Sequence, residues 1–211
     1  MKLKVKICGI TNPADAVLAE KYGADLIGMV FSRSPRKINT AAAKKIISVL
    51  SPFTMKAGVF VNESPVKVIA AAERARLDVI QLHGEEEPEY IRTIKNSGLN
   101  VKIIKAVRVK DRQAAAGALE KYRTTADAFL FDAYDPVLKG GTGKTFDPGF
   151  VKGPAAYGFV AGGITPENVC GIIKETDPMG IDVSSGVEKE KGKKSEVKIK
   201  RLFEKIRTCG K

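Results

Sequence analysis

The sequence is poor in the residues that bind metals or form disulfide frameworks. It has no tryptophan, one histidine, His83, and three widely separated cysteines, Cys8, Cys170 and Cys209, no two of which have CxxC spacing. Zinc sites and disulfide frameworks need closely spaced or regularly paired ligands. We therefore expect no metal site, no disulfide framework, and a protein of the reducing cytoplasm.

Long apolar runs are also missing. No run approaches the roughly 18 residues that cross a bilayer, and the N-terminus has no apolar signal-peptide core. We expect neither secretion nor a membrane partner. The 211 residues, 44% of them apolar, suffice for one well-packed domain, which we place at residues 1–211.

Acidic residues are outnumbered, with 24 Asp and Glu against 36 Lys and Arg, which gives a net charge of +12. Such a balance suits a nucleic-acid binder or an enzyme with an anionic substrate, or it simply solvates the surface. Many lysines occupy the polar positions of amphipathic segments, and no basic stretch is interleaved with aromatic residues. We expect no nucleic-acid partner.

Short apolar runs alternate with amphipathic segments along the chain. The first run, "KLKVKIC", alternates with period two, and Asn12-Pro13 after it is typical of a helix start. Seven further runs read as strands: "ADLIGMVF", "KAGVFV", "LDVIQLH", "VKIIKAVRV", "AFLFDAY", "YGFVAGG" and "MGIDVSSG". The expected helices lie at residues 13–22, 40–50, 64–76, 86–96, 110–122, 148–153, 166–175 and 195–208.

Eight strand–helix units in this length match a closed (β/α)8 barrel, the TIM-barrel fold of the α/β class. A doubly wound open sheet is the alternative, but no GxGxxG follows the first strand, and polar or small residues end nearly every strand. A barrel gathers these strand ends on one rim, where barrel enzymes carry their active sites.

Small residues end the seventh and eighth strands. "AGGIT" contains Gly162 and Gly163, and "VSSGVE" contains Ser184, Ser185 and Gly186. Barrel enzymes often bind phosphate at these two loops through backbone N–H groups, so we expect a phosphate site there. "LKGGTGKT" resembles a nucleotide-binding P-loop, but Leu138 stands where that motif needs glycine. We expect residues 135–146 to form a mobile loop over the rim instead.

Four side chains near the rim allow both a structural and a functional interpretation. Cys8 is either a packing residue or a reactive thiol, and Asp132 is either a loop cap or a general acid whose pKa is raised by burial. Arg36 is either a solvated cation or a fork for a carboxylate. Lone His83 is more typical of a hydrogen-bonded structural group.

Taken in order, the motifs resemble the phosphoribosylanthranilate isomerase family of tryptophan biosynthesis. The similar segments span the chain: "KICGIT", "GMVFSRSPRKI", "GVFVN", "IQLHGEE", "FLFDAY", "GGTGKTFD", "AGGITPENV" and "GIDVSSGVE". One departure is Pro148, which follows "FD" where the family usually has tryptophan.

The resemblance implies Cys8 as general base and Asp132 as general acid for an Amadori rearrangement of N-(5′-phosphoribosyl)anthranilate. It further implies Arg36 for the anthranilate carboxylate, Gln81 and Asp182 for substrate binding, and the glycine and serine loops for phosphate. Proton transfers suffice for this chemistry, so we expect no cofactor. The expected partners are a small phosphosugar substrate and a second copy of the chain in a homodimer. The histidine-pathway isomerase and a ligand-binding barrel without turnover are the alternatives.

The period of the first strand adds one expectation. If Cys8 points into the barrel, Lys6 does so too, about 6.6 Å below it. Its ammonium then either favours the Cys8 thiolate or is neutralised by an inward carboxylate such as Asp182.

Overall fold

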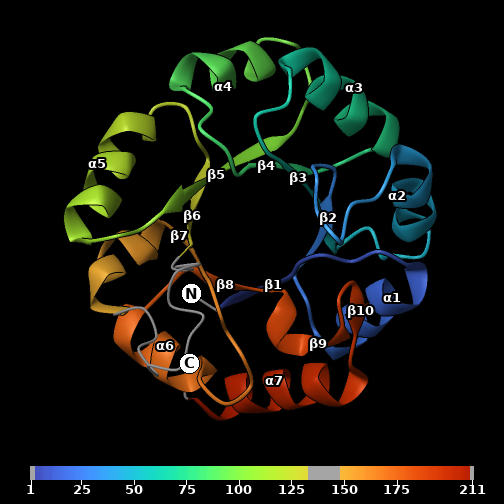
Figure 1. Cartoon of the computed structure of the whole chain (residues 1–211), viewed down its shortest axis with the longest axis vertical. Helices are drawn as coiled ribbons and strands as arrows, with labels where there is room; N and C mark the ends of the chain where they lie inside the picture. Colours follow the sequence, from blue (N-terminus) through green and yellow to red (C-terminus); the bar gives the residue numbers. More distant parts are fainter. Residues whose placement is uncertain (1–2, 133–147, 210–211) are drawn as a thin grey trace.

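The computed structural model describes residues 3–132 and 148–209. Eight parallel strands form a closed barrel in sequence order, β1 to β8, and a ring of helices surrounds it (Figure 1). The predicted (β/α)8 barrel is therefore confirmed. The strands are β1 Lys4–Ile7, β2 Leu26–Val30, β3 Met55–Phe60, β4 Val79–Leu82, β5 Lys102–Arg108, β6 Ala128–Asp132, β7 Gly158–Ala161 and β8 Gly180–Val183.

Four of the seven α-helices in the described residues begin at a residue whose side chain caps the helix. Asn12 accepts a hydrogen bond from the backbone of Asp15, and Pro13 follows as the first residue of its helix. Asn39, Asp111 and Ser195 cap three other helices in the same way. The helices are α1 Pro13–Tyr22, α2 Thr40–Ile47, α3 Pro65–Ala75, α4 Pro88–Lys95, α5 Arg112–Tyr122, α6 Val169–Thr176 and α7 Glu196–Thr208.

The segment between β6 and β7 differs from the prediction. Instead of one helix at 148–153, the described part of this segment contains two short 3-10 helices, η2 (Pro148–Val151) and η3 (Pro154–Tyr157). Gly149 and Gly153 are poor helix formers, and Pro154 cannot donate a backbone hydrogen bond, so a continuous α-helix is not favoured here. The expected mobile loop at 135–146 lies outside the described residues.

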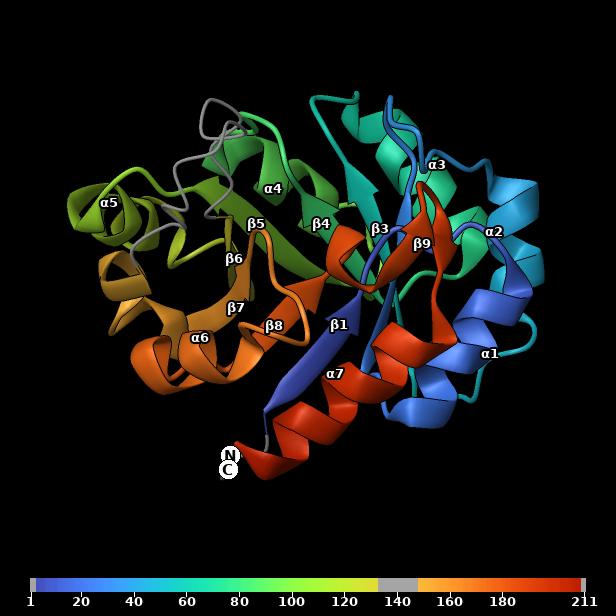
Figure 2. The same cartoon turned by 60° about the horizontal axis from the view of Figure 1, so that its bottom comes forward.

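A small hairpin after β8 was not predicted. The 3-10 turn η4 (Ser185–Val187) leads into β9 (Glu188–Glu190), which pairs with β10 (Lys193–Lys194). Figure 2 shows β9 above α7, beside the end of the barrel toward which β1 points. The hairpin therefore stands on the rim that carries the strand ends.

The expectation that the cysteines form no disulfide is wrong. Cys170 of α6 is bonded to Cys209, the residue after α7, across 39 residues of sequence and with 5.4 Å between their Cα atoms. The two helices become neighbours only in the folded ring, so no short spacing reveals the pair. Cys8 is the free cysteine.

The core has two layers. Apolar side chains from alternate strand positions, such as Leu26, Leu130 and Phe159, fill the barrel interior, while the opposite positions pack against the helices. Within the described segments, no helix is both long and apolar enough to cross a membrane.

Candidate active site

A cavity of about 300 Å³ opens at the carboxyl ends of the strands. Every residue that the sequence places in the site lines this cavity, and these residues come from six of the eight strand ends. They are Cys8, Arg36, Gln81, Asp132, Gly162, Gly163, Asp182, Ser184, Ser185 and Gly186. The structure thus brings the predicted residues together, while their roles remain predictions.

Cys8 follows β1 and is buried at the base of the cavity. Lys6, two residues earlier on the same face, is fully buried and bonds Asp182 of β8, with 2.9 Å between Lys6 Nζ and Asp182 Oδ2. The inward pair expected from the alternation is therefore present. Burial raises the pKa of the Cys8 thiol; the Lys6 ammonium offsets part of this increase, and the Asp182 carboxylate adds to it.

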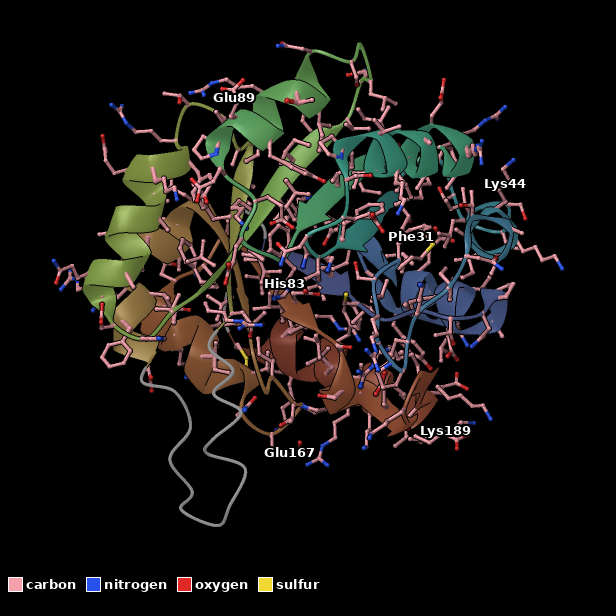
Figure 3. All side chains as sticks on the ribbon, turned by 45° about the horizontal axis from the view of Figure 1, so that its top comes forward. Phe31, Lys44, His83, Glu89, Glu167 and Lys189 are labelled. Atoms are coloured by element: carbon pink, nitrogen blue, oxygen red, sulfur yellow. A yellow bond between two sulfur atoms is a disulfide. The ribbon has the colours of Figure 1, made fainter. Side chains whose placement is uncertain are left out.

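His83 links two of the predicted residues. The Gln81 amide nitrogen lies 3.0 Å from His83 Nδ1, and His83 Nε2 lies 3.0 Å from Asp132 Oδ2. Because the amide nitrogen donates to Nδ1, Nε2 carries the hydrogen that is donated to the carboxylate. Figure 3 shows His83 near the middle of the barrel opening. His83 is therefore hydrogen-bonded, as predicted, and one of its two partners is the candidate acid Asp132.

Two buried side-chain acceptors lack a hydrogen-bond partner among the described residues. They are Gln81 Oε1 and Asp182 Oδ1, and both residues line the cavity. An unpaired buried acceptor is costly, so a site that keeps two of them suits a ligand with hydroxyl or amine donors.

Arg36 comes from the loop after β2 and is not a free solvated cation. Its Nε and Nη2 donate to the two oxygens of Glu188 at 2.7 and 2.6 Å. Lys194 Nζ donates to the same carboxylate at 2.9 Å. Glu188 and Lys194 were missed by sequence reasoning, because the charge-rich run "VEKEKGKK" looks like an exposed surface segment.

The loops after β7 and β8 adopt the tight conformations expected of an anion site. Gly162 and Gly163 have φ of 101° and 64°, which side-chain-bearing residues rarely adopt. Ser184 precedes the short turn η4, which contains Ser185 and Gly186, and a Cβ on Gly186 would collide with the carbonyl oxygen of Ile164 in the loop after β7. Backbone groups of both loops can therefore approach one bound anion.

A larger cavity of about 420 Å³ lies beside the first, between the ends of β4 and β5 and helix α5. His83 lines both cavities, but the larger one contains neither Cys8 nor the glycine and serine loops. The larger cavity therefore lacks the candidate base and the candidate anion site, and we assign the active site to the smaller cavity. Among the described residues, no three His, Cys, Asp or Glu side chains are grouped to hold a metal ion.

The closed parallel barrel, with a cavity at its strand ends that is lined by the Cys8 thiol and the Asp132 carboxylate, has the architecture of a (β/α)8-barrel enzyme. Comparison with known proteins narrows this class. Residues 5–205 match the family described as N-(5′-phosphoribosyl)anthranilate (PRA) isomerase. The chain belongs to this family, so the resemblance drawn from its motifs is confirmed, and it is an isomerase.

Individual relatives agree with this assignment. The N-(5′-phosphoribosyl)anthranilate isomerase of Moorella thermoacetica is 45% identical over 208 residues, which cover 97% of this chain and 90% of the relative. The isomerase of Thermotoga maritima has a crystal structure that matches with a TM-score of 0.87 at 39% identity, covering 97% of this chain and 98% of that one. A family member in complex with reduced 1-(o-carboxyphenylamino)-1-deoxyribulose 5-phosphate matches with a TM-score of 0.84 at 37% identity and the same coverage.

Proposed function

We propose that this chain converts N-(5′-phosphoribosyl)anthranilate to 1-(2-carboxyphenylamino)-1-deoxyribulose 5-phosphate in tryptophan biosynthesis. Cys8 acts as general base and Asp132 as general acid. The observation that supports this most is their common cavity: Cys8 follows β1, Asp132 ends β6, and both side chains reach the same space. A substrate between them is open to proton transfer from two sides.

The proton transfers follow from this arrangement. Asp132 gives its proton to the furanose ring oxygen, the C1′–O bond breaks, and the ring opens to an iminium ion. The Asp132 carboxylate that remains receives a hydrogen bond from His83 Nε2. Cys8, as thiolate, removes the C2′ proton to give an enolamine, which tautomerises to the ketone product. No electron carrier is needed.

The two ends of the substrate are held by different groups. Arg36 binds the anthranilate carboxylate, because a guanidinium fork suits a planar carboxylate. The unpaired acceptors on Gln81 and Asp182 receive hydrogen bonds from the sugar portion. The phosphate is held by Gly162, Gly163, Ser184, Ser185 and Gly186.

The test is to incubate the purified protein with freshly prepared N-(5′-phosphoribosyl)anthranilate and to follow product formation. Cys8→Ala and Asp132→Asn serve as inactive controls. Substrate binding without turnover would instead identify a ligand-binding barrel, and turnover of the histidine-pathway substrate alone would identify the other isomerase. Either result would overturn the proposal.

The assembly and location of the enzyme belong to the same proposal. We infer one domain over residues 1–211, a cytoplasmic location and a homodimer, without nucleic-acid or membrane partners. A structure of monomers generated from the dimeric isomerase of Thermotoga maritima matches at 37% identity and a TM-score of 0.84, and its description names the parent enzyme as dimeric. Light scattering on the purified protein measures the mass directly, and a single-chain mass near 22.7 kDa would refute the homodimer.

A further inference from the structure

Arg36 is held by a buried pair of charges on the β9–β10 hairpin. Glu188 and Lys194 face each other across the two strands, and their side chains are 5% and 0% exposed, against 21% for Arg36. Glu188 Oε1 accepts from both Arg36 Nε and Lys194 Nζ. The order from the cavity inward is therefore arginine, glutamate, lysine.

This contact uses one edge of the guanidinium group. The Nε–Nη2 edge bonds Glu188, and among the described residues no other acceptor bonds the group. A guanidinium has five N–H donors in a planar fork, so Nη1 and the second hydrogen of Nη2 remain available. They form the end edge, which can bind a second carboxylate with two hydrogen bonds.

The position of the arginine is fixed from the other side by Gly9. A Cβ on Gly9 would collide with Arg36 Cδ, and φ at Gly9 is 73°. The aliphatic part of Arg36 therefore lies directly on the backbone of the loop after β1. Glycine allows both this close approach and this backbone conformation.

Lys194 has an electrostatic consequence for the cavity. An arginine paired with one glutamate is neutral overall and would attract a carboxylate only weakly. With Lys194 behind the pair, two cations and one carboxylate leave one net positive charge. Because the lysine and glutamate are buried, this charge is screened less by solvent than a surface cation would be.

The hairpin is anchored to the barrel rather than free on its surface. The backbone N–H of Lys194 donates to Asp15 of α1, and Thr11 Oγ1 donates to the carbonyl of Gly192 between the two hairpin strands. Lys194 Nζ also donates to the carbonyl of Ser184 at 3.1 Å. The hairpin thus connects Ser184, in the loop of the candidate phosphate site, with the carboxylate that holds Arg36.

We propose that Glu188 and Lys194 are positioning residues that determine recognition of the substrate's aromatic carboxylate. Glu188 orients the guanidinium so that its end edge faces the cavity, and Lys194 keeps that site positively charged. This inference rests on the proposed role of Arg36. It makes the hairpin a determinant of specificity for a substrate with a carboxylate at the end opposite its phosphate.

Two ligands separate this role from a purely structural one. One is reduced 1-(2-carboxyphenylamino)-1-deoxyribulose 5-phosphate, and the other is the same compound without the carboxylate. Their dissociation constants are measured by calorimetry for the parent chain, Glu188→Gln and Lys194→Met. Glu190→Gln is the matched control, since Glu190 lies on the same strand but is 60% exposed and pairs with Lys193.

Glu188→Gln is expected to raise the Kd of the carboxylate ligand about tenfold, the scale of one charge-assisted hydrogen bond, and to leave the other ligand within about twofold. Lys194→Met is likewise expected to raise the Kd of the carboxylate ligand and to leave that of the other ligand unchanged. Glu190→Gln is expected to change the Kd of neither ligand. In an Arg36→Met background, Glu188→Gln should have no further effect. Glu188→Asp, which keeps the charge, replaces Glu188→Gln if that variant does not fold.

Equal weakening of both ligands, or an effect of Glu188→Gln that persists without Arg36, would overturn the inference. The parent chain and Arg36→Met separate this failure from that of the proposed function. If Arg36→Met raises the Kd of both ligands equally, or of neither, the proposed binding of the carboxylate by Arg36 is wrong. If Arg36→Met weakens only the carboxylate ligand and a folded Glu188 variant does not, only the proposed role of the hairpin is wrong.

Discussion

Replacing Cys209 by serine removes the covalent link between α6 and the end of α7 and should destabilise the barrel substantially. The disulfide closes a loop of 39 residues in sequence. In the chain-entropy description, such a link lowers the entropy of the unfolded chain by about 13 cal/mol/K, or about 4 kcal/mol at 25 °C. For a chain of 211 residues, that loss corresponds to a decrease in Tm of roughly 8–16 °C.

The assay is thermal unfolding followed by circular dichroism, with and without reducing agent. A thiol titration of the denatured, unreduced protein should find one free thiol, Cys8, rather than three. The Tm of Cys170→Ser and of the double variant should equal that of Cys209→Ser. Reducing agent should leave the Tm of all three variants unchanged. A Tm that is the same within about 2 °C for the oxidised and reduced parent chain would refute the loop-entropy reasoning, and three free thiols would refute the pairing.

Three further predictions concern the cavity. Cys8→Ala and Asp132→Asn should each lower kcat by at least about 100-fold with little change in substrate binding, because acid and base act in the transition state; near-full activity at saturating substrate would exclude that residue. Arg36→Met should raise KM more than it lowers kcat, and inorganic phosphate should compete with substrate and raise Tm; no competition at constant ionic strength would argue against the phosphate site. Lys6→Met should move the alkylation pKa of Cys8 upward, since the lost ammonium no longer favours the thiolate; an unchanged pKa in a folded variant would exclude this influence.

The barrel could be predicted because its signal is local and repeated. Each strand is a short apolar run, and residues such as Asn12 and Asp111 mark helix starts by hydrogen bonds to the backbone three positions later. The connection between β6 and β7 failed this reasoning, since glycines and prolines replace a helix with 3-10 turns. Local signals therefore located the repeats, but not the one connection where α-helix propensity is low.

The site was predictable where residues follow strand ends, since barrel topology alone collects them. The pair between Lys6 and Asp182 was anticipated as one alternative, because the alternation of the first strand turns Lys6 inward. Other contacts between distant residues were not predicted. The disulfide joins positions 39 residues apart, and Arg36 finds Glu188 across 152 residues. Glu188 lies in a run of alternating charges that is typical of an exposed segment, and its burial depends on a hairpin folded against the rim. Such pairings depend on three-dimensional packing and leave no periodic pattern.

The ion pair between Lys6 and Asp182 has a consequence for how the protein is made. Its partners are 176 residues apart and come from the first and last strands of the barrel. On the ribosome, the lysine emerges early, but its carboxylate exists only when nearly the whole chain has been synthesised. Until then, the Lys6 ammonium has no carboxylate to pair with, and burying it alone would be costly, so it stays in water. The first strand is thus kept from packing into an apolar core prematurely, and the ion pair beside Cys8 can form only when β8 has been synthesised and closes the ring.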